Sequence, residues 1–388
     1  MDQAASFDAV ARARMLGPAI AASADEIEVN QRFPEPLLSR LLEARLFRLL
    51  LPRSCGGEQV DPSTYLRALI EVSRCDGSVG WNMFVANSAC LIAPFLPLES
   101  AHAVFGDPRS VCAWGAVNGT AARAVEGGYW IEGEWDFASG CRQANWMGAH
   151  GPVLESDGSY RLNEFGRPLI RTWLFPAAEA ELLDNWNPVG LKGTASESYR
   201  VPGVFVPEEF SSTREYPEQR REPGPLYAFP QQGLYAVGVA GVALGLARAM
   251  LDAFRDLAME KTPRGRPRLA LDALVQAGFA RTEAQWGSAR AYMLQTLEDI
   301  YARADEMEPI RVDDRAGVRL CCSHAIHTAL SAADWVHKEA GVSAIFPGSP
   351  FERHWRDIHT VSQQIQSRSA HFEAVGQILL GQPPEVFF

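Results

Sequence analysis

The chain has 388 residues, 47% of them hydrophobic and 21% charged, with a formal net charge of −11. This composition predicts a soluble globular protein of two or three packed units. Because the chain is acidic and has no basic run, it predicts no nucleic-acid partner and no membrane surface as a partner. The first residues lack a basic start followed by an apolar core, so no secretory signal is expected. Seven cysteines without a C-x-x-C pair indicate reduced thiols in a cytoplasmic protein.

Residues 1–115 are predicted to form an N-terminal helical domain. An early segment places leucines at helical steps after a pair of prolines. Asp61 and Pro62 predict an N-cap and a first-turn proline for a helix that continues to Arg74. After a short break, a further apolar helix is expected to run to Phe95.

Residues 116–225 are predicted to form an antiparallel, β-barrel-like middle domain. Two short β-type runs flank Gly127 and Gly128, which is a hairpin signal. Further short strands are expected in "WMGAHGPVL", "RTWLFP" and "YRVPGVFVP".

Residues 226–388 return to the helical period and are predicted to form a C-terminal four-helix bundle. The four helical segments are 233–261, 270–306, 314–340 and 351–380. The least polar stretch, 233–247, is shorter than the roughly 20 residues of a membrane span, and we expect a tightly packed core helix there. The last segment contains "RDIHTVSQQIQSRSAHF" (356–372), whose apolar spacing predicts one continuous helix without a carboxylate after its opening Arg-Asp pair.

Few residue patterns in the chain carry chemistry by themselves. Phosphate-binding, dinucleotide-binding and nucleophile-elbow signatures are missing. His324 and His327 lie one helical turn apart without a third ligand at a convincing spacing, so no metal site is expected. Hydroxyl groups follow the β runs at Ser139, in "GEWDFASGC", and at Thr194 and Ser196, in "GLKGTASESYR". Taken alone, such residues are typical of solvated turns.

The order of these elements resembles the acyl-CoA dehydrogenase fold family. The motifs that carry the resemblance are W-x-F-x-S-G, G-L-[KR]-G-T-x-S, and a closing helical region with "PFERHWRD" and "GQILLG". The resemblance covers nearly the whole chain and implies a flavoprotein, usually a homotetramer, whose flavin ring lies between the β domain and the bundle. The residues at the matching flavin positions are Ser139, Thr194 and Ser196, with Arg264 or Arg266 and the Gly341 region serving the flavin phosphates of a neighbouring subunit.

The acid-free stretch distinguishes between two branches of this family. In the dehydrogenases a Glu removes the substrate α-proton, and its commonest position falls at or next to Ile365, where this chain has no Glu. Without a base, that weakly acidic proton stays in place. A second known location, on an earlier bundle helix, leaves Glu260 and Glu283 open. An acyl-CoA dehydrogenase-like enzyme with a displaced base is therefore the alternative hypothesis, and a catalytically silent flavin-fold scaffold is a third.

The stretches "SRCDGSVGWNMFVAN", "FASGC" and "SPFERHWRDIHTVSQ" resemble more closely the flavin-dependent two-component monooxygenases, group D. Oxygenase components of that branch take reduced flavin (FADH2 or FMNH2) from a separate NAD(P)H-dependent reductase and hydroxylate a small aromatic, such as an indole or a phenol, through a C4a-hydroperoxyflavin. The protein must exclude water, hydrogen-bond the flavin edge and hold the substrate. The resemblance places Ser139 near flavin N5, where its hydroxyl would delay the loss of hydrogen peroxide.

The chain departs from the phenol-hydroxylating members, which carry a His where Gln363 and Gln364 stand. Glutamine cannot accept a proton at neutral pH, so His359 is the candidate base beside Gln364; packing of His359 against Trp355 is the alternative. An electron-rich ring such as indole would need no base. The residues expected to contact the substrate are Trp81, Asn87, Trp114 and Ile365.

Overall fold

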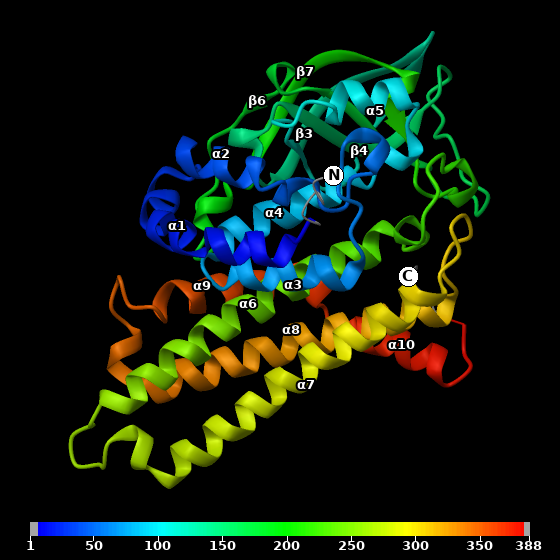
Figure 1. Cartoon of the computed structure of the whole chain (residues 1–388). Coiled ribbons are helices and arrows are strands. Elements are labelled where there is room, and N and C mark those ends of the chain that lie inside the picture. Colours follow the sequence, from blue (N-terminus) through cyan, green and yellow to red (C-terminus); the bar gives the residue numbers. More distant parts are fainter. Residues whose placement is uncertain (1–6, 384–388) are drawn as a thin grey trace, which may run out of the picture.

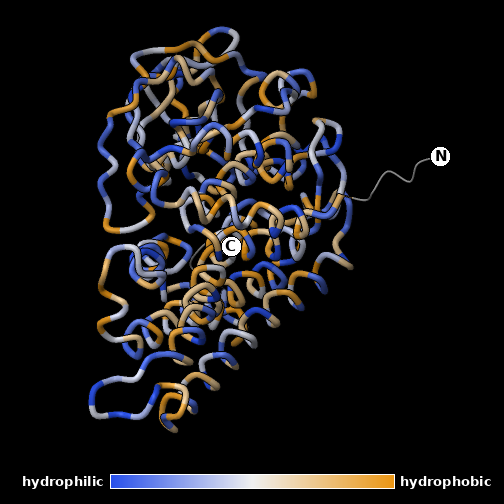
Figure 2. Tube along the Cα trace, turned by 60° about the vertical axis from the view of Figure 1, so that its left-hand side comes forward, coloured by the Kyte–Doolittle hydropathy of each residue, from blue (hydrophilic) through white to orange (hydrophobic). Residues whose placement is uncertain are grey.

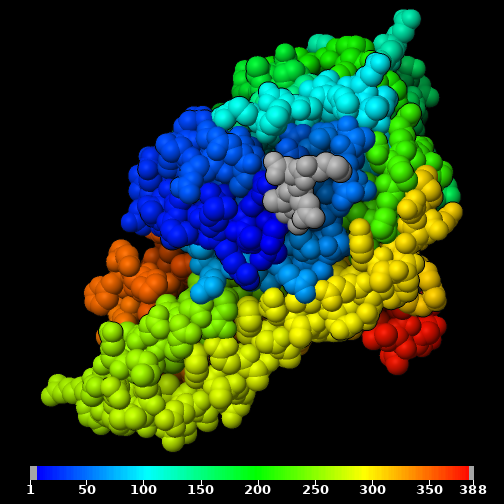
Figure 3. All heavy atoms as spheres, in the orientation of Figure 1, coloured from blue at the N-terminus to red at the C-terminus, as the bar shows by residue number. Residues whose placement is uncertain are grey.

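The computed structural model describes residues 7–383. A helical region comes first, a β region follows, and long helices close the chain (Figure 1). In the space-filling view the N-terminal region, in blue, fills the space between the β region and α7 (Figure 3). The helices of the N-terminal region are α1 (Ala9–Asn30), α2 (Glu35–Glu43), α3 (Pro62–Ser73), α4 (Gly77–Cys90) and α5 (Leu98–Phe105).

The helix starts follow the local sequence. The carboxylate of Asp61 accepts hydrogen bonds from the backbone N–H groups of Ser63 and Thr64, both at 2.9 Å, so α3 begins as predicted. Asp76 caps α4 in the same way, accepting from Val79 N at 2.8 Å. Every residue of α4 is buried, because the helix touches α3, α6, α9 and the sheet. The expected helix to Phe95 ends earlier, at Cys90.

The β region is one sheet in the order β6-β7-β3-β2-β4-β5-β8, with β1 beside β4. The predicted hairpin joins β2 to β3, with Val125 opposite Gly128. The sheet is mixed rather than purely antiparallel: the hairpin occupies one edge of β2, and β4 runs parallel to β2 along the other edge and to β1. The strands are β1 (Cys112–Trp114), β2 (Ala122–Val125), β3 (Gly128–Ala138), β4 (Trp146–Leu154), β5 (Ile170–Pro176), β6 (Glu181–Leu182), β7 (Glu197–Pro207) and β8 (Ser211–Ser212).

The C-terminal region contains three long helices and two short ones. In Figure 2 hydrophobic and hydrophilic residues alternate along these helices, as expected for helices with one buried face. The helices are α6 (Gln231–Glu260), α7 (Ala273–Arg303), α8 (Val312–Ala340), α9 (Glu352–Val361) and α10 (Ala370–Leu379).

Helix α6 is the core helix of the molecule. Its glycine face contacts α3 and α4: a Cβ at Gly238 would lie 2.5 Å from the Phe84 ring, and one at Gly245 would lie 2.6 Å from Ser73 Cβ. This face therefore serves packing within the chain rather than assembly of subunits. Within residues 7–383, α6 is the one helix whose length and composition would allow it to cross a membrane, and 83% of its apolar window is buried inside the chain.

The prediction of one helix over 351–380 is wrong. Helix α9 ends at Val361, and the chain is extended at Gln364 before α10 begins. The reason is a set of tertiary hydrogen bonds to the buried side chain of Gln366. Its amide accepts from Arg319 and donates to Gln232 Oε1 at 2.8 Å. These bonds outweigh the helical spacing of the apolar residues.

Candidate active site

The three predicted hydroxyl groups meet in one buried row, here called the hydroxyl chain (Ser139, Ser196, Thr194). Ser139 Oγ lies 2.6 Å from Ser196 Oγ, which lies 2.7 Å from Thr194 Oγ1. Thr194 donates to the carbonyl oxygen of Leu191 at 2.8 Å. At the other end, Trp81 Nε1 donates to Ser139 Oγ at 3.0 Å. The structure thus brings Trp81 and the three hydroxyls together.

Strand pairing explains this meeting. Ala138, at the end of β3, pairs with Glu197, at the start of β7. The residues just outside this pair, Ser139 and Ser196, therefore face each other. Gly140 then turns the chain with φ of 79° and donates its N–H to the carbonyl of Thr194 at 2.8 Å. Leu191 also has positive φ, at 53°, a backbone strain that such functional loops often carry.

The Arg-Asp pair at the centre of α9 fixes the loop that carries Thr194 and Ser196. Asp357 Oδ1 accepts from Leu191 N at 2.6 Å, and Arg356 Nη1 donates to Val189 O at 2.7 Å. Gly190 fits so closely that a Cβ there would lie 2.2 Å from Arg356 O. In the sequence, the Arg356-Asp357 pair only marked the start of the stretch that lacks the dehydrogenase Glu. Its positioning role was missed, because no local pattern shows which loop the pair contacts.

Two buried carboxyl groups lie beside the start of α4. Burial, together with the charge of Asp76, raises the pKa of Asp357 to about 7. Burial likewise raises the pKa of Asp76 to about 6. A Cβ at Gly77 would lie 3.0 Å from Asp357 Oδ2, so the carboxyl and the helix start are in contact. Asp76 thus holds a backbone N–H of α4, and Asp357 holds that of Leu191.

Two amide side chains that the sequence did not single out adjoin the hydroxyl chain. Asn82 Oδ1 and Gln143 Nε2 are buried and have no hydrogen-bond partner among residues 7–383. A Cβ at Gly140 would lie 3.6 and 3.7 Å from these two atoms. A flavin ring presents both N–H donors and carbonyl acceptors at its pyrimidine edge, so an unpaired acceptor and an unpaired donor beside three hydroxyls fit it. Only the three-dimensional arrangement reveals these residues.

Trp114, a predicted substrate contact, does not itself line the cavity of about 540 Å³ but lies behind Arg214, which does. Its ring contacts the His150 ring at 4.7 Å, and Arg214 lies over its face at 5.2 Å. His150 Nδ1 is 2.7 Å from Thr172 Oγ1. Burial, together with the charge of Arg214, holds the pKa of His150 well below its usual value, so His150 is neutral. Arg214 lines the cavity, which lies between the β region and the starts of α6 and α8.

Asn87 does not line this cavity, and the expectation that it contacts the substrate is therefore corrected. The side chain is fully buried, accepts from Leu50 N at 3.1 Å, and donates to the carbonyls of Leu46 and Met83, both at 2.8 Å. It therefore links α4 to the turn between α2 and α3.

The other residues near the C-terminus that were expected to act in catalysis or to contact the substrate are also not placed as expected. His359 Nε2 lies 2.8 Å from Asp334 Oδ1, and its ring packs on Trp355 at 4.2 Å. This is the packing alternative, and it follows because residues two apart on a helix, such as Asp357 and His359, point to opposite sides. Gln364 uses its side chain to accept from Gln366 N. Ile365, an expected substrate contact, is 50% exposed, because α9 ends before it.

The predicted phosphate-binding residues lie at the end of the bundle farthest from the sheet (Figure 1). Arg266 pairs with Asp272 at 2.6 Å. Gly341 lies beside Lys261, whose Nζ donates to Ser343 Oγ at 2.9 Å. Arg264 and Arg266 therefore do not reach the hydroxyl chain of their own chain, and their contact with a neighbouring subunit's flavin stays a prediction.

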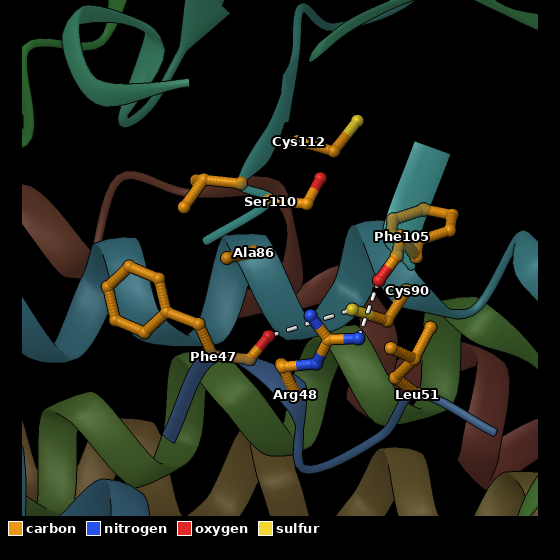
Figure 4. Close-up of a pocket in the computed structure, with 9 residues that line it drawn as sticks. Phe47, Arg48, Leu51, Ala86, Cys90, Phe105, Ser110 and Cys112 are labelled. Carbon is orange, nitrogen blue, oxygen red and sulfur yellow. Dashed lines mark hydrogen bonds between the residues drawn. The ribbon is translucent and has the colours of Figure 1, made fainter. Parts of the chain in front are cut away.

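A second hollow, around Arg48, is structural (Figure 4). The Arg48 guanidinium donates to the carbonyl oxygens of Asp107 at 2.6 Å and Cys55 at 2.9 Å, among others. The hollow has no room for a water-sized group, and the Arg48 guanidinium donates its hydrogen bonds to backbone carbonyl oxygens. Among the described residues, no group of three or more His, Cys, Asp or Glu side chains is placed to hold a metal ion.

Comparison with known proteins identifies the family to which this architecture belongs. The family described as acyl-CoA dehydrogenase, N-terminal domain, matches residues 8–97, and the acyl-CoA dehydrogenase C-terminal domain matches residues 237–368. The chain belongs to the acyl-CoA dehydrogenase family. The predicted fold class is thereby confirmed.

Relatives within the acyl-CoA dehydrogenase family identify the branch. Indole-3-acetate monooxygenase of Pseudomonas putida is 28% identical over 99% of this chain and 99% of its own. The oxygenase subunit HsaA of a flavin-dependent monooxygenase of Rhodococcus jostii is 27% identical over 88% of this chain and 90% of its own. The structure of XiaF from Streptomyces sp., in complex with FADH2 and glycerol, superposes with a TM-score of 0.88 at 23% identity, covering 98% of this chain and 96% of that one. The predicted monooxygenase branch and its reduced flavin are confirmed by these relatives.

Proposed function

We propose that this chain is the oxygenase component of a two-component flavin-dependent monooxygenase. It uses reduced flavin from a separate NAD(P)H-dependent reductase, and O2, to hydroxylate a small aromatic substrate that is indole- or phenol-like. The observation that carries the proposal is the buried hydroxyl chain beside Trp81, together with a segment, 358–372, that runs from the end of α9 to the start of α10 and contains no carboxylate.

The direction of the hydrogen bonds assigns Ser139 its task. Thr194 donates to a carbonyl, so its oxygen accepts from Ser196, and Ser196 in turn accepts from Ser139. With this direction the single proton of Ser139 is donated to Ser196, and Trp81 N–H occupies one lone pair of its oxygen, so the second lone pair is left to accept a hydrogen bond from the flavin edge. A bound reduced flavin would supply the activation of O2 and the oxygen atom that is transferred. Ser139, Asn82 and Gln143 would hydrogen-bond its edge, and their burial excludes water.

The residues that would support dehydrogenation are engaged elsewhere. Glu283 forms a two-bond ion pair with Arg248, both bonds at 2.7 Å. Glu260 is exposed at the last residue of α6. Neither offers a free base near the hydroxyl chain, which favours oxygen transfer over α-proton abstraction. With His359 turned away, an electron-rich ring that needs no base, such as indole, is the substrate that the site supports best.

The test is an assay with purified protein, a generic flavin reductase, NADH, FAD or FMN, and a panel of indoles and phenols. Hydroxylated product that depends on this chain is expected. A parallel incubation with acyl-CoA thioesters and an artificial electron acceptor is expected to give no enoyl-CoA. Enoyl-CoA formation there, without aromatic hydroxylation, would replace this proposal with the dehydrogenase alternative.

We also propose a cytoplasmic homotetramer whose flavin sites are completed across subunits. The supporting observation is that large apolar side chains are exposed close to Arg264 and Arg266, at the far end of the bundle. They are Leu271, Leu274, Val342, Ile345 and Phe346. All seven cysteines are free thiols in the structure, as a reducing compartment requires.

A further inference from the structure

The cavity beside Trp114 is rich in arginine. Four arginines line it, at 167, 214, 220 and 315, against a single lining carboxylate, Glu215. That carboxylate is already used, since it accepts from Ile170 N at 3.0 Å and from Asn163 Nδ2 at 2.8 Å. The remaining lining is largely apolar and aromatic, with Leu91, Phe95, Tyr227 and Phe229. The cavity therefore combines an apolar wall with a positive side.

Two of these arginines have buried donors without acceptors. Arg220 is 5% exposed; its Nη2 donates to Glu306 O at 2.8 Å, whereas Nε and Nη1 have no partner among residues 7–383. Arg214 donates from Nη2 to Thr172 Oγ1 at 3.0 Å, and its Nη1 is likewise unpaired. Asp305, the acid with the strongest influence on Arg220, uses its carboxylate to accept from two backbone N–H groups of its own loop. Buried charged donors left unpaired are costly, so they call for an acceptor.

The arginines are connected to the hydroxyl chain through Trp114. Arg214 lies over the Trp114 ring at 5.2 Å. The next residue, Gly115, is so close to β3 that a Cβ there would lie 2.5 Å from Trp135 Cβ and 3.1 Å from Asp136 O. Ser139 follows on the same strand end three residues later. The Trp114 ring that Arg214 covers is thus connected through Gly115 to the strand that leads to Ser139.

We propose that Arg214 and Arg220 bind the carboxylate of the aromatic substrate, so that the enzyme acts on aryl or indolyl carboxylic acids in preference to their neutral counterparts. The planar guanidinium presents paired N–H donors that match a carboxylate. Burial lowers the pKa of Arg214 to about 10, which leaves it charged at neutral pH. The inference rests on the proposed function, because it names the substrate class of that same site.

The experiment compares binding of acid and amide pairs by isothermal titration calorimetry, independently of turnover. The probes are indole-3-acetate and indole-3-acetamide, followed by the corresponding carboxylates with shorter and longer tethers. The wild-type protein is expected to bind indole-3-acetate at least about tenfold more tightly than the amide. Arg214→Gln and Arg220→Gln are each expected to bring this ratio close to one. Arg200→Gln, on the exposed face of β7, is the matched control and should keep the preference, and Arg220→Lys, which keeps the charge, should keep part of it.

Equal binding of acid and amide to the wild-type protein would overturn the proposal. So would an acid preference that survives both glutamine variants. The arms also include reduced FMN and riboflavin: if Arg220→Gln weakens FMN relative to riboflavin without changing acid binding, the arginines hold the flavin phosphate instead. Hydroxylation of neutral indole without an acid preference would defeat this inference and leave the proposed function standing. An arginine-dependent acid preference in a protein that hydroxylates no aromatic would do the reverse.

Discussion

At the scale of single residues, Ser139 has two neighbours with opposite demands. Trp81 donates to its oxygen, and Ser196 lies ready to accept its proton. A residue at this position must therefore accept and donate at once, which alanine cannot do. The same reasoning separates Ser139 from the buried serines of the sheet that only donate to carbonyls, such as Ser212.

We expect Ser139→Ala to fold normally but to release more hydrogen peroxide per O2 consumed. Loss of one preorganised hydrogen-bonding group in a dry site costs about 2.7–4 kcal/mol of stabilisation, and Trp81 N–H also loses its acceptor. The measurement is the ratio of peroxide to hydroxylated product, with Ser212→Ala as the control. An unchanged ratio in Ser139→Ala would remove this hydroxyl from the mechanism.

The buried carboxyls predict a pH dependence of stability. In the folded state the pKa values of Asp76 and Asp357 are raised, to about 6 and about 7. The folded chain therefore holds protons that the unfolded chain has released, so this contribution to the unfolding free energy is largest at low pH. It declines from about pH 4 to about pH 7.

Asp357→Asn keeps an acceptor for Leu191 N–H but cannot ionise. We expect the variant to show a smaller fall in unfolding free energy between about pH 5 and about pH 8 than the wild-type protein does. Urea denaturation at both pH values measures this fall, and Asp256→Asn, at an exposed position near the end of α6, is the control. A fall as steep in Asp357→Asn as in the wild-type protein would show that Asp357 ionises without cost in the fold.

At the scale of elements, the loop from Val189 to Ser196 depends on α9 for its shape. Gly190→Ala would place a Cβ 2.2 Å from Arg356 O, so the loop must move and carry Thr194 with it. We expect this variant to bind reduced flavin at least about tenfold more weakly, a loss near 1.4 kcal/mol. Flavin fluorescence under anaerobic conditions gives the affinity. Gly287→Ala, in α7 with open space around it, should leave the affinity unchanged.

The same scale shows what sequence can and cannot predict. The starts of α3 and α4 could be predicted from the sequence because their capping hydrogen bonds are local. Ser139 and Ser196 could be predicted because they belong to motifs at strand ends. The break after Val361 could not be predicted, since Gln366 is drawn inward by Arg319 and Gln232, far away in sequence. The unpaired amides of Asn82 and Gln143 were also inaccessible, because only packing shows that they lack partners.

At the scale of the whole molecule, the proposed homotetramer predicts the mass of the assembly in solution. Light scattering should report about four times the 42.6 kDa of one chain. Phe346→Glu, at an exposed apolar position, is expected to lower this mass, because a charge would replace a buried contact between subunits. Glu179→Gln, at an exposed position of the β region, serves as control. An active, monodisperse single chain would contradict the proposal.

The complete burial of α4 also bears on how the protein is made. This helix is synthesised early, yet its walls include α6 and α9, and α9 ends at Val361. During translation, at about 5–20 residues per second, α4 therefore waits for tens of seconds before its last partners leave the ribosome. In that interval its apolar residues, from Val79 to Cys90, have only part of their native cover, which comes from α3 and the segments made early. The growing chain therefore exposes an apolar helix face until α6 and α9 have emerged.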